Sequence, residues 1–228
     1  MIGIIGAMEI EVEKIKAFLT DTKTETVSGV NFVCGKFENK DIVVAKCGVG
    51  KVFAGLCAEA MILKYAPELI INVGVAGCLD STLKIGDIVI ADSVCQHDMD
   101  TSPLGDPVGL LSDINIVKIP ADEKAYKLFS ECAKELNLPY SVGTIASGDQ
   151  FVSSADKKKY IIDNFGAKSC EMEGGAIGHV CHVNNVPFAV LRAMSDGADD
   201  CANMDFPTFV KLAAENSTKV IKAFLSKI

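Results

Sequence analysis

Arginine is almost absent from this sequence. Arg192 is the only arginine among 22 basic residues, in a chain of 228 residues with a net charge of −8. No lysine stripe with interleaved aromatics is present either, since the run Lys157, Lys158 and Lys159 at an expected helix start is typical of a solvated face. We therefore expect no nucleic-acid partner. Because lysine serves for charge elsewhere, Arg192 indicates a site that needs a planar, permanently charged guanidinium.

Signals for disulfides, metals and membranes are missing as well. The nine cysteines are an odd number without a Cys-x-x-Cys pair, and several lie in apolar runs, which is typical of free thiols in a reducing cytoplasmic compartment. The first segment turns acidic after one short apolar run, and no apolar run reaches membrane-spanning length, so we expect neither a signal peptide nor a membrane anchor. His179 and His182 share a helix without further ligands, so no metal site is expected.

Apolar, β-branched runs alternate with helical patterns along the chain, which predicts one α/β domain over residues 1–228. Continuous runs such as ELIINVGVAG and PFAVLRAMSD are typical of strands buried on both faces, and so of a mixed central sheet covered by helices. We expect strands at residues 2–5, 32–37, 42–46, 69–73, 87–91, 141–146 and 188–193. We expect helices at residues 9–19, 51–65, 122–136, 154–165, 173–184 and 207–225. The long polar connection 96–113 is typical of a functional or interfacial loop.

Glycine-containing turns follow several expected strands, in GIIGAM, AKCGVGK, INVGVAGC, ASGDQF and RAMSDG. Ligands of open α/β sheets bind beyond the carboxyl ends of strands, so these turns are expected to line one site. The turn CGVGKV is not a P-loop, because Val52 follows Lys51 where serine or threonine is required. It is not a dinucleotide fingerprint either, because Phe53 stands at the third glycine position.

Three carboxylates each have two open interpretations. Glu11 falls within the apolar stripe of the first helix, so it either has partners and a task or lies at the rim and reaches water. Glu173 opens a helix, where the dipole keeps a glutamate ionised, and it is either that ordinary charge or an acceptor for two hydroxyls. Asp196 ends a buried strand, where it is either a general acid or a residue that forms the following turn. The turn-forming role fits Asp199 and Asp200 better.

The motifs GIIGAMEIEVE, GVGKV, INVGVAGCL, SGDQF, CEMEGGAIGHVCH and RAMSD occur in this order along the whole chain. Together they closely resemble the bacterial 5′-methylthioadenosine/S-adenosylhomocysteine nucleosidases of the nucleoside phosphorylase superfamily. The resemblance implies that superfamily's fold and hydrolysis of the N-glycosidic bond of 5′-thioadenosines, an activity of methionine salvage, without metal or organic cofactor. With the loop 96–113 and the unpaired cysteines, we expect a reduced homodimer in which each loop lies near its partner's pocket.

The resemblance also implies roles for single residues. Asp196 resembles the general acid that protonates adenine N7, and Ser195 the residue that orients it. Glu11 resembles the base that activates water, with Glu171 as the next candidate. Arg192 resembles the arginine that orders the water and the carboxylates. The implied substrate-binding residues are Glu173 for the ribose hydroxyls, Met172 against the sugar, Phe151 stacked on adenine, Val152 at the base edge, and Met8, Val49, Gly77 and Phe206 in the pocket lining.

Departures from the family pattern leave alternatives open. Val75 stands where the family has a serine near the water, and the sequence PLGDPVGL stands where aromatics often reach the partner's pocket. A nucleoside phosphorylase would need cations for phosphate, but Glu11 and Asn72 occupy the positions where phosphorylase relatives carry arginines. A futalosine-type nucleosidase shares the acid and the fold. A nucleoside-binding sensor without catalysis is favoured by Val75 and opposed by the three carboxylates.

Overall fold

The computed structural model describes residues 1–199 and 201–228, so Asp200, expected in the turn after the last strand, lies outside the described residues. The strands are β1 (Ile2–Gly6), β2 (Thr20–Val27), β3 (Val30–Phe37), β4 (Lys40–Lys46), β5 (Leu69–Cys78), β6 (Ile88–Gln96), β7 (Ile119–Pro120), β8 (Tyr140–Ser147), β9 (Ser169–Glu171) and β10 (Phe188–Asp196). The helices are α1 (Glu9–Ala17), α2 (Lys51–Tyr65), α3 (Glu123–Glu135), α4 (Ala155–Phe165), α5 (Gly174–Val183) and α6 (Ala202–Lys227), with a short 3-10 helix at Ser102–Leu104.

Within the described chain, the strands form one mixed sheet in the order β10-β6-β8-β9-β5-β1-β4-β3-β2, with β7 beside β6. Strand β5 pairs with β10 as well as with β9, so β5, β10, β6, β8 and β9 close into a ring, and β1, β4, β3 and β2 extend from it. Strands β1, β4, β5 and β10 run parallel to their neighbours in this group, which brings their carboxyl ends to one edge.

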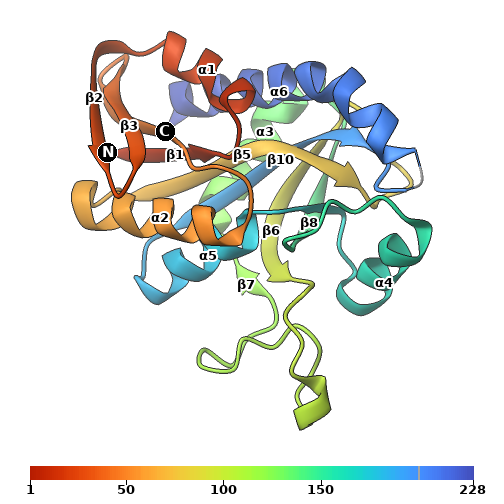
Figure 1. Ribbon diagram of the computed structural model, residues 1–228. Helices are drawn as coiled ribbons and strands as arrows, with labels where there is room; N and C mark the ends of the chain where they lie inside the picture. Colours follow the sequence, from red (N-terminus) through yellow and green to blue (C-terminus); the bar gives the residue numbers. More distant parts are fainter. Residues whose placement is uncertain (200) are drawn as a thin grey trace.

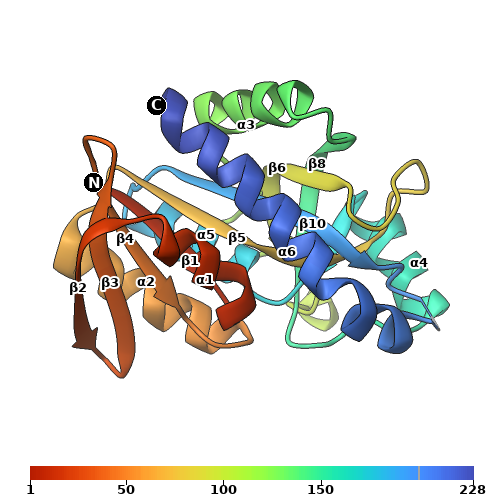
Figure 2. The ribbon, with the colours of Figure 1, turned by 90° about the horizontal axis from the view of Figure 1, so that it is seen from above.

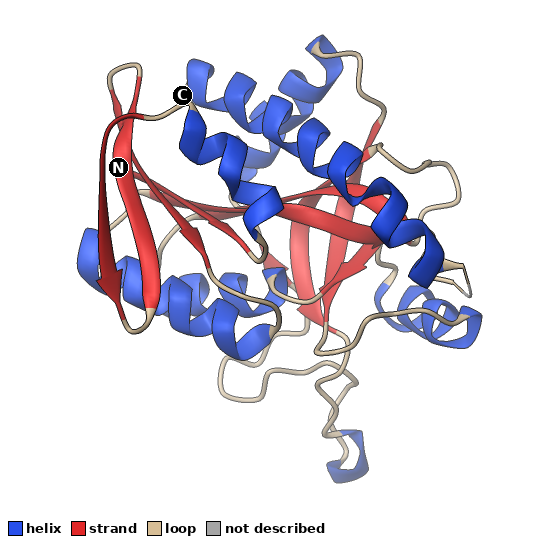
Figure 3. Cartoon of the chain, turned by 45° about the horizontal axis from the view of Figure 1, so that its top comes forward, coloured by secondary structure: helices blue, strands red, loops and turns tan. Residues whose placement is uncertain are grey.

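Helices cover both faces of the sheet. Helices α1, α3 and α6 lie on one face, and α2 and α5 pack together on the other (Figures 1 and 2). The two layers of helices and the sheet between them are clear in Figure 3. Strand residues alternate between two cores: Ile5 and Ile70 face α2 and α5, whereas Ile4 and Ile71 face α1 and α6. The predicted fold class, a mixed sheet covered by helices, is confirmed, because the apolar runs are buried on both faces.

The structure adds elements that sequence patterns did not predict. Strand β2 was missed because it is an edge strand whose polar side chains are mostly exposed on both faces, and β7 and β9 are too short to show a pattern. Helix α6 begins at Ala202, before the expected residue 207, and contains Pro207. The proline lacks the N–H that would bond the carbonyl of Asn203, but that residue is exposed to water.

The long connection was predicted at residues 96–113. In the structure it starts after Gln96, where β6 ends, and it continues until β7 begins at Ile119. Figure 1 shows the connection between β6 and β7 extending away from the body of the molecule. It contains the 3-10 helix and a bridge between Leu111 and Ile116, and Leu104 at its tip is 84% exposed. Among the described residues, no helix is both long and apolar enough to cross a bilayer.

Candidate active site

A cavity of about 330 Å³ opens where β1, β4, β5, β8, β9 and β10 end. Every expected site residue except Arg192 lines it, so the glycine turns do meet at one place. The lining residues are Ala7, Met8, Glu11, Val49, Val75, Ala76, Gly77, Gln150, Phe151, Val152, Cys170, Glu171, Met172, Glu173, Ser195, Asp196 and Phe206.

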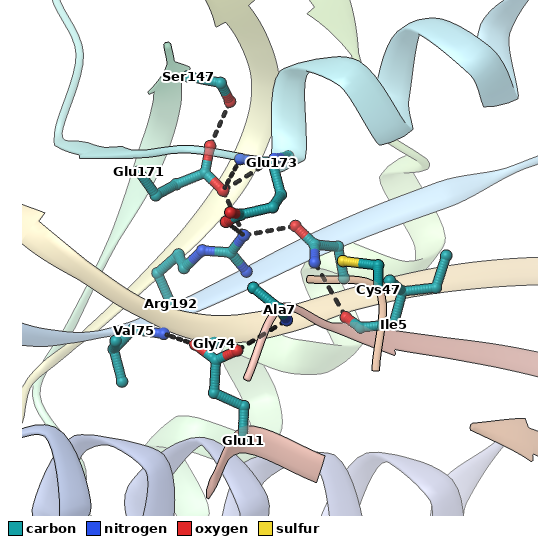
Figure 4. A network of polar contacts seen from close by, with 12 residues as sticks. Ile5, Ala7, Glu11, Cys47, Gly74, Val75, Ser147, Glu171, Glu173 and Arg192 are labelled. Atoms are coloured by element: carbon teal, nitrogen blue, oxygen red, sulfur yellow. Dashed lines mark hydrogen bonds and ion pairs between the residues drawn. The ribbon is translucent and has the colours of Figure 1, made fainter. Parts of the chain in front are cut away.

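Glu11 is buried in the first turn of α1 and is held by three backbone amides. Its Oε2 accepts hydrogen bonds of 2.8 Å from the N–H groups of Ala7 and Met8, and its Oε1 accepts one of 3.0 Å from Val75 (Figure 4). A carboxylate has about four acceptor positions, so roughly one remains for a ligand or water. Burial raises the pKa of Glu11, against the Arg192 charge and the three amides, which lower it. The rim interpretation is therefore excluded, since only 4% of Glu11 is exposed.

The β5 backbone beside this carboxylate needs a residue without a side chain. A Cβ on Gly74 would lie 2.5 Å from Oε1 of Glu11, closer than atoms pack. The next residue, Val75, donates its amide to Glu11 and is among the residues that line the cavity. Since Val75 bonds Glu11 through its main chain, a change of the side chain at this position leaves that hydrogen bond in place.

Arg192 lies behind the cavity wall and is 1% exposed. Its Nη2 donates to Glu171 and to the amide oxygen of Asn72, and lies 4.0 Å from a Glu173 oxygen. Figure 4 shows Arg192 between Glu171 and Glu173 on one side and Glu11 on the other. The guanidinium thus orders carboxylates, and its implied role toward the water stays a prediction.

Glu173 is the N-cap residue of α5 and faces the cavity. Its Oε1 accepts a 2.8 Å hydrogen bond from the Gly50 amide, which ties it to the start of α2. Burial, and then the neighbouring Glu171 charge, raise its pKa, against the charge of Arg192. Desolvation and the like charge of Glu171 therefore oppose the helix dipole, which favours the ionised form of Glu173. The charge of Arg192 acts on all three buried glutamates, Glu171, Glu173 and Glu11.

Asp196 ends β10 with both carboxyl oxygens occupied. Oδ2 accepts a 2.8 Å hydrogen bond from the Ser195 hydroxyl, and Oδ1 accepts one of 2.9 Å from the Ala198 amide. Burial raises the pKa of Asp196 in spite of these two hydrogen bonds. A buried aspartic acid with a raised pKa is suited to give a proton to a group in the cavity.

The remainder of the lining is mostly apolar and forms the open side of the cavity. The rings of Phe151 and Phe206 meet edge to face with centroids 5.7 Å apart, although Phe151 is 48% exposed. Met8, Val49 and Met172 complete this side, which fits a flat or apolar ligand group.

The model of the phosphorylase superfamily matches residues 1–226. The chain belongs to the phosphorylase superfamily. A superfamily relative from Shewanella loihica, named 5′-methylthioadenosine/S-adenosylhomocysteine nucleosidase, is 37% identical over 229 residues, covering 100% of this chain and 99% of the relative. This likeness confirms the resemblance to the nucleosidases that the motifs indicated.

Two solved structures have the same fold over the full length of this superfamily member. The nucleosidase from Neisseria meningitidis in complex with methylthio-immucillin-A has a TM-score of 0.96 at 32% identity, covering 100% of this chain and 99% of that one. The futalosine hydrolase of Helicobacter pylori also has a TM-score of 0.96, at 37% identity, covering 100% of this chain and 97% of that one.

Several residues of this superfamily site were missed by sequence reasoning or were given another role. Glu171 accepts from Arg192 and from the amides of Glu173 and Gly174 on Oε2, and from Ser147 on Oε1. Asn72, noted only as a replaced arginine, joins Arg192 to the Ile5 carbonyl. The one available signal was Asn72 itself, because a polar side chain inside a buried apolar run needs a hydrogen-bond partner. Gln150, Ala76 and Cys170 carried no signal.

The histidines lie outside this cavity. His179 Nδ1 is 3.4 Å from the side-chain nitrogen of Gln96, between α5 and the end of β6. Across the described residues, no group of three histidine, cysteine or acidic side chains is arranged to hold a metal ion.

Proposed function

We propose that this protein hydrolyses the N-glycosidic bond of 5′-methylthioadenosine and S-adenosylhomocysteine, releasing adenine and a 5-thioribose product. The observation that carries the proposal is the pair of buried carboxyl groups that line one cavity, Glu11 on α1 and Asp196 at the end of β10. Inverting glycosidases use such a pair, with one acid that protonates the leaving group and one base that activates water on the opposite face. The names of the similar nucleosidases support the substrate class.

The mechanism assigns one task to each wall of the cavity. Asp196 gives its proton to N7 of adenine and makes the base a better leaving group, while Ser195 holds the carboxyl in place. Positive charge then develops on the ribose, and Glu11 takes a proton from the attacking water. Glu173 accepts from the ribose hydroxyls. Phe151 stacks on the base, whose edge meets the backbone of Val152.

Phosphorolysis is disfavoured by the charge of the lining. Among the described residues that line the cavity, none is lysine, arginine or histidine, whereas phosphate binding calls for cationic donors. A non-catalytic sensor is disfavoured because Glu11, Glu173 and Asp196 all reach the same cavity.

The purified protein is expected to release adenine from both nucleosides in phosphate-free, chelator-treated buffer, because water bound at Glu11 is the proposed nucleophile. A coupled absorbance assay with and without added phosphate measures this. Adenine release that depends on added phosphate would identify a phosphorylase, and tight nucleoside binding without turnover would identify a sensor.

A second candidate is hydrolysis of a futalosine-type nucleoside, favoured by the 0.96 TM-score and 37% identity to the futalosine hydrolase. The same catalytic acid and catalytic base serve either substrate. Recognition of the 5′ tail and of the purine base therefore decides between the two substrates. Comparing kcat/KM for futalosine and for methylthioadenosine in one assay separates the two, and a higher value for futalosine would overturn the first assignment.

We also infer a homodimer in a reducing cytoplasm. All nine cysteines are free thiols, which supports the compartment. Helices α2 and α5 pack together and expose apolar side chains, among them Val52 at 80%, Leu63 at 76% and Val183 at 57%. Exposed apolar groups on one face support an interface. The connection between β6 and β7 supports it further, because it extends away from the body of the molecule.

Light scattering is expected to give the mass of two chains, and Val52→Glu to shift it toward one chain, because a charge would be buried in the interface. Leu136→Glu is the matched control, since Leu136 is exposed at the end of α3, away from α2 and α5. A fully active wild-type monomer would contradict the dimer.

A further inference from the structure

Three loops at the rim of the cavity are joined by one carboxylate. Asp98, just after β6, accepts a 2.6 Å hydrogen bond from Lys51 Nζ on its Oδ1. Its Oδ2 accepts one of 2.8 Å from the backbone N–H of Asp149, in the loop after β8. Lys51 is the first residue of α2, so Asp98 links the loops that follow β4, β6 and β8.

A second set of contacts closes this arrangement. The Asp149 side chain accepts a 2.7 Å hydrogen bond from the Lys51 amide, so Lys51 and Asp149 are joined both directly and through Asp98. The preceding amide, Gly50 N–H, donates to Glu173. We call Lys51, Asp98 and Asp149 the loop clamp.

The loop after β8 is also packed from the other side. His97 is buried, and its ring occupies the space beside Gly148, where a Cβ would lie 2.4 Å from a ring carbon. The His97 amide donates a 2.8 Å hydrogen bond to the Ser147 carbonyl, which extends the pairing of β6 and β8. The position of residues 148 and 149 is thus set by the segment that begins at His97.

The clamp ends where the cavity lining begins. Gln150, Phe151 and Val152 follow Asp149 directly, line the cavity and belong to no helix or strand. Because Phe151 is half exposed, its own packing restrains it only in part, and the anchor at Asp149 carries more of that task. Side chains of Lys51 and Asp98 are only 20% and 18% exposed, so their ion pair is weakly screened by water.

We propose that Asp98, together with Lys51, is a positioning residue that holds the segment 149–152 in place for binding of the purine base. The assignment of the base to Phe151 and Val152 rests on the proposed function, whereas the clamping of the segment does not. Asp98 acts through the backbone of Asp149 and touches no substrate. The proposed catalytic acid and catalytic base lie on β10 and α1, outside the clamped segment. Loss of the clamp is therefore expected to affect binding of the purine more than the chemical step.

Asp98→Asn is the sharpest test, because the amide keeps the shape but sets an NH2 group against either the Lys51 ammonium or the Asp149 N–H. Losing a charge-assisted hydrogen bond is expected to raise the Kd for adenine and the KM about tenfold or more, with kcat changed less than about threefold.

Lys51→Met is expected to raise the same two constants, and Lys51→Arg to restore part of the affinity. The double variant of Asp98→Asn and Lys51→Met is expected to bind adenine no more weakly than the poorer single variant. Glu135→Gln, which breaks the pair with Lys227 between α3 and α6, is the control and is expected to leave all constants unchanged.

Calorimetry gives the adenine Kd, and hydrogen exchange of the amides of 149–152 tests the clamp without any substrate. Faster exchange there in Asp98→Asn supports the clamp even if the wild type proves not to release adenine, which would overturn only the proposed function. Unchanged exchange, or a folded variant with adenine Kd and KM within twofold of wild type, would overturn the clamp. If Asp98→Asn does not fold, Lys51→Met is judged by the same outcomes.

Discussion

Asp196→Asn is expected to slow adenine release about 10²–10⁴-fold, or about 3–5 kcal/mol of activation free energy, while adenine still binds. The asparagine side chain has the shape of the acid but no carboxylic proton to give. Burial raises the pKa of Asp196, which favours its acid form, and in the proposed mechanism its replacement removes the proton transfer that makes adenine a leaving group.

The fold is expected to tolerate this change because both hydrogen bonds survive. The amide oxygen of asparagine accepts from the Ala198 N–H in place of Oδ1. The Ser195 hydroxyl is 3.4 Å from the Ala76 carbonyl, so it turns its proton there and accepts from the new NH2 group. Neither the Ala198 amide nor the Ser195 hydroxyl is then left without a partner.

Turnover and adenine affinity of Asp196→Asn are measured beside Asp199→Asn, a control in the following turn. In the wild type, kcat is expected to fall as the pH rises above the pKa of Asp196, because the acid form is consumed, and this alkaline limb should vanish in the variant. Near-normal turnover of a folded Asp196→Asn would mean that another group protonates the base.

Glu11→Gln is expected to abolish hydrolysis, a loss of at least about 10²-fold, because a neutral amide cannot take a proton from water. The three amides that hold Glu11 all donate, and glutamine offers them only one acceptor oxygen. Its NH2 end then faces an N–H group, which is expected to destabilise the protein by about 1–3 kcal/mol without unfolding it. Adenine release gives the rate, and circular dichroism checks the fold.

Val75→Ser is the companion variant. Its main-chain bond to Glu11 is unchanged, and its hydroxyl adds a partner for water in the cavity, worth about 1 kcal/mol. We expect the rate to hold or rise. A folded Val75→Ser that is much slower would show that water is positioned differently here.

Full activity of Glu11→Gln would contradict the assignment of the base. Glu171, the next candidate from the sequence, is poorly placed to replace it. Arg192 and two backbone amides already donate to its Oε2, and Ser147 donates to its Oε1, so both oxygens are engaged within the protein. The structure thus makes Glu11 the better candidate, and Glu171 the partner that fixes Arg192.

Sequence patterns were enough for the sheet with its two helical layers and for the place of the site. Side-chain periodicity and apolar runs are local properties, and a turn after a parallel strand lies at the same edge as its neighbours. That is why the turns that contain Met8, Phe151 and Asp196 were expected together and meet in one cavity, whereas the place of Glu11 in the site was implied by the resemblance to the nucleosidases. Polar edge strands such as β2, and strands of two or three residues, were not predicted because their sequences show no clear alternation of apolar and polar residues.

The tertiary structure alone decided which partner each buried charge has. Arg192 meets Asn72 across 120 residues, Gly50 meets Glu173 across 123, and Lys51 meets Asp98 across 47. It also decided that burial and the charge of Glu171 raise the pKa of Glu173, since neither can be inferred from its place at a helix start. By itself the sequence determined which residue types stand at the ends of the strands. Hydrogen-bond partners and desolvation depend on distances between strands that are far apart in the chain, and local spacing does not contain those distances.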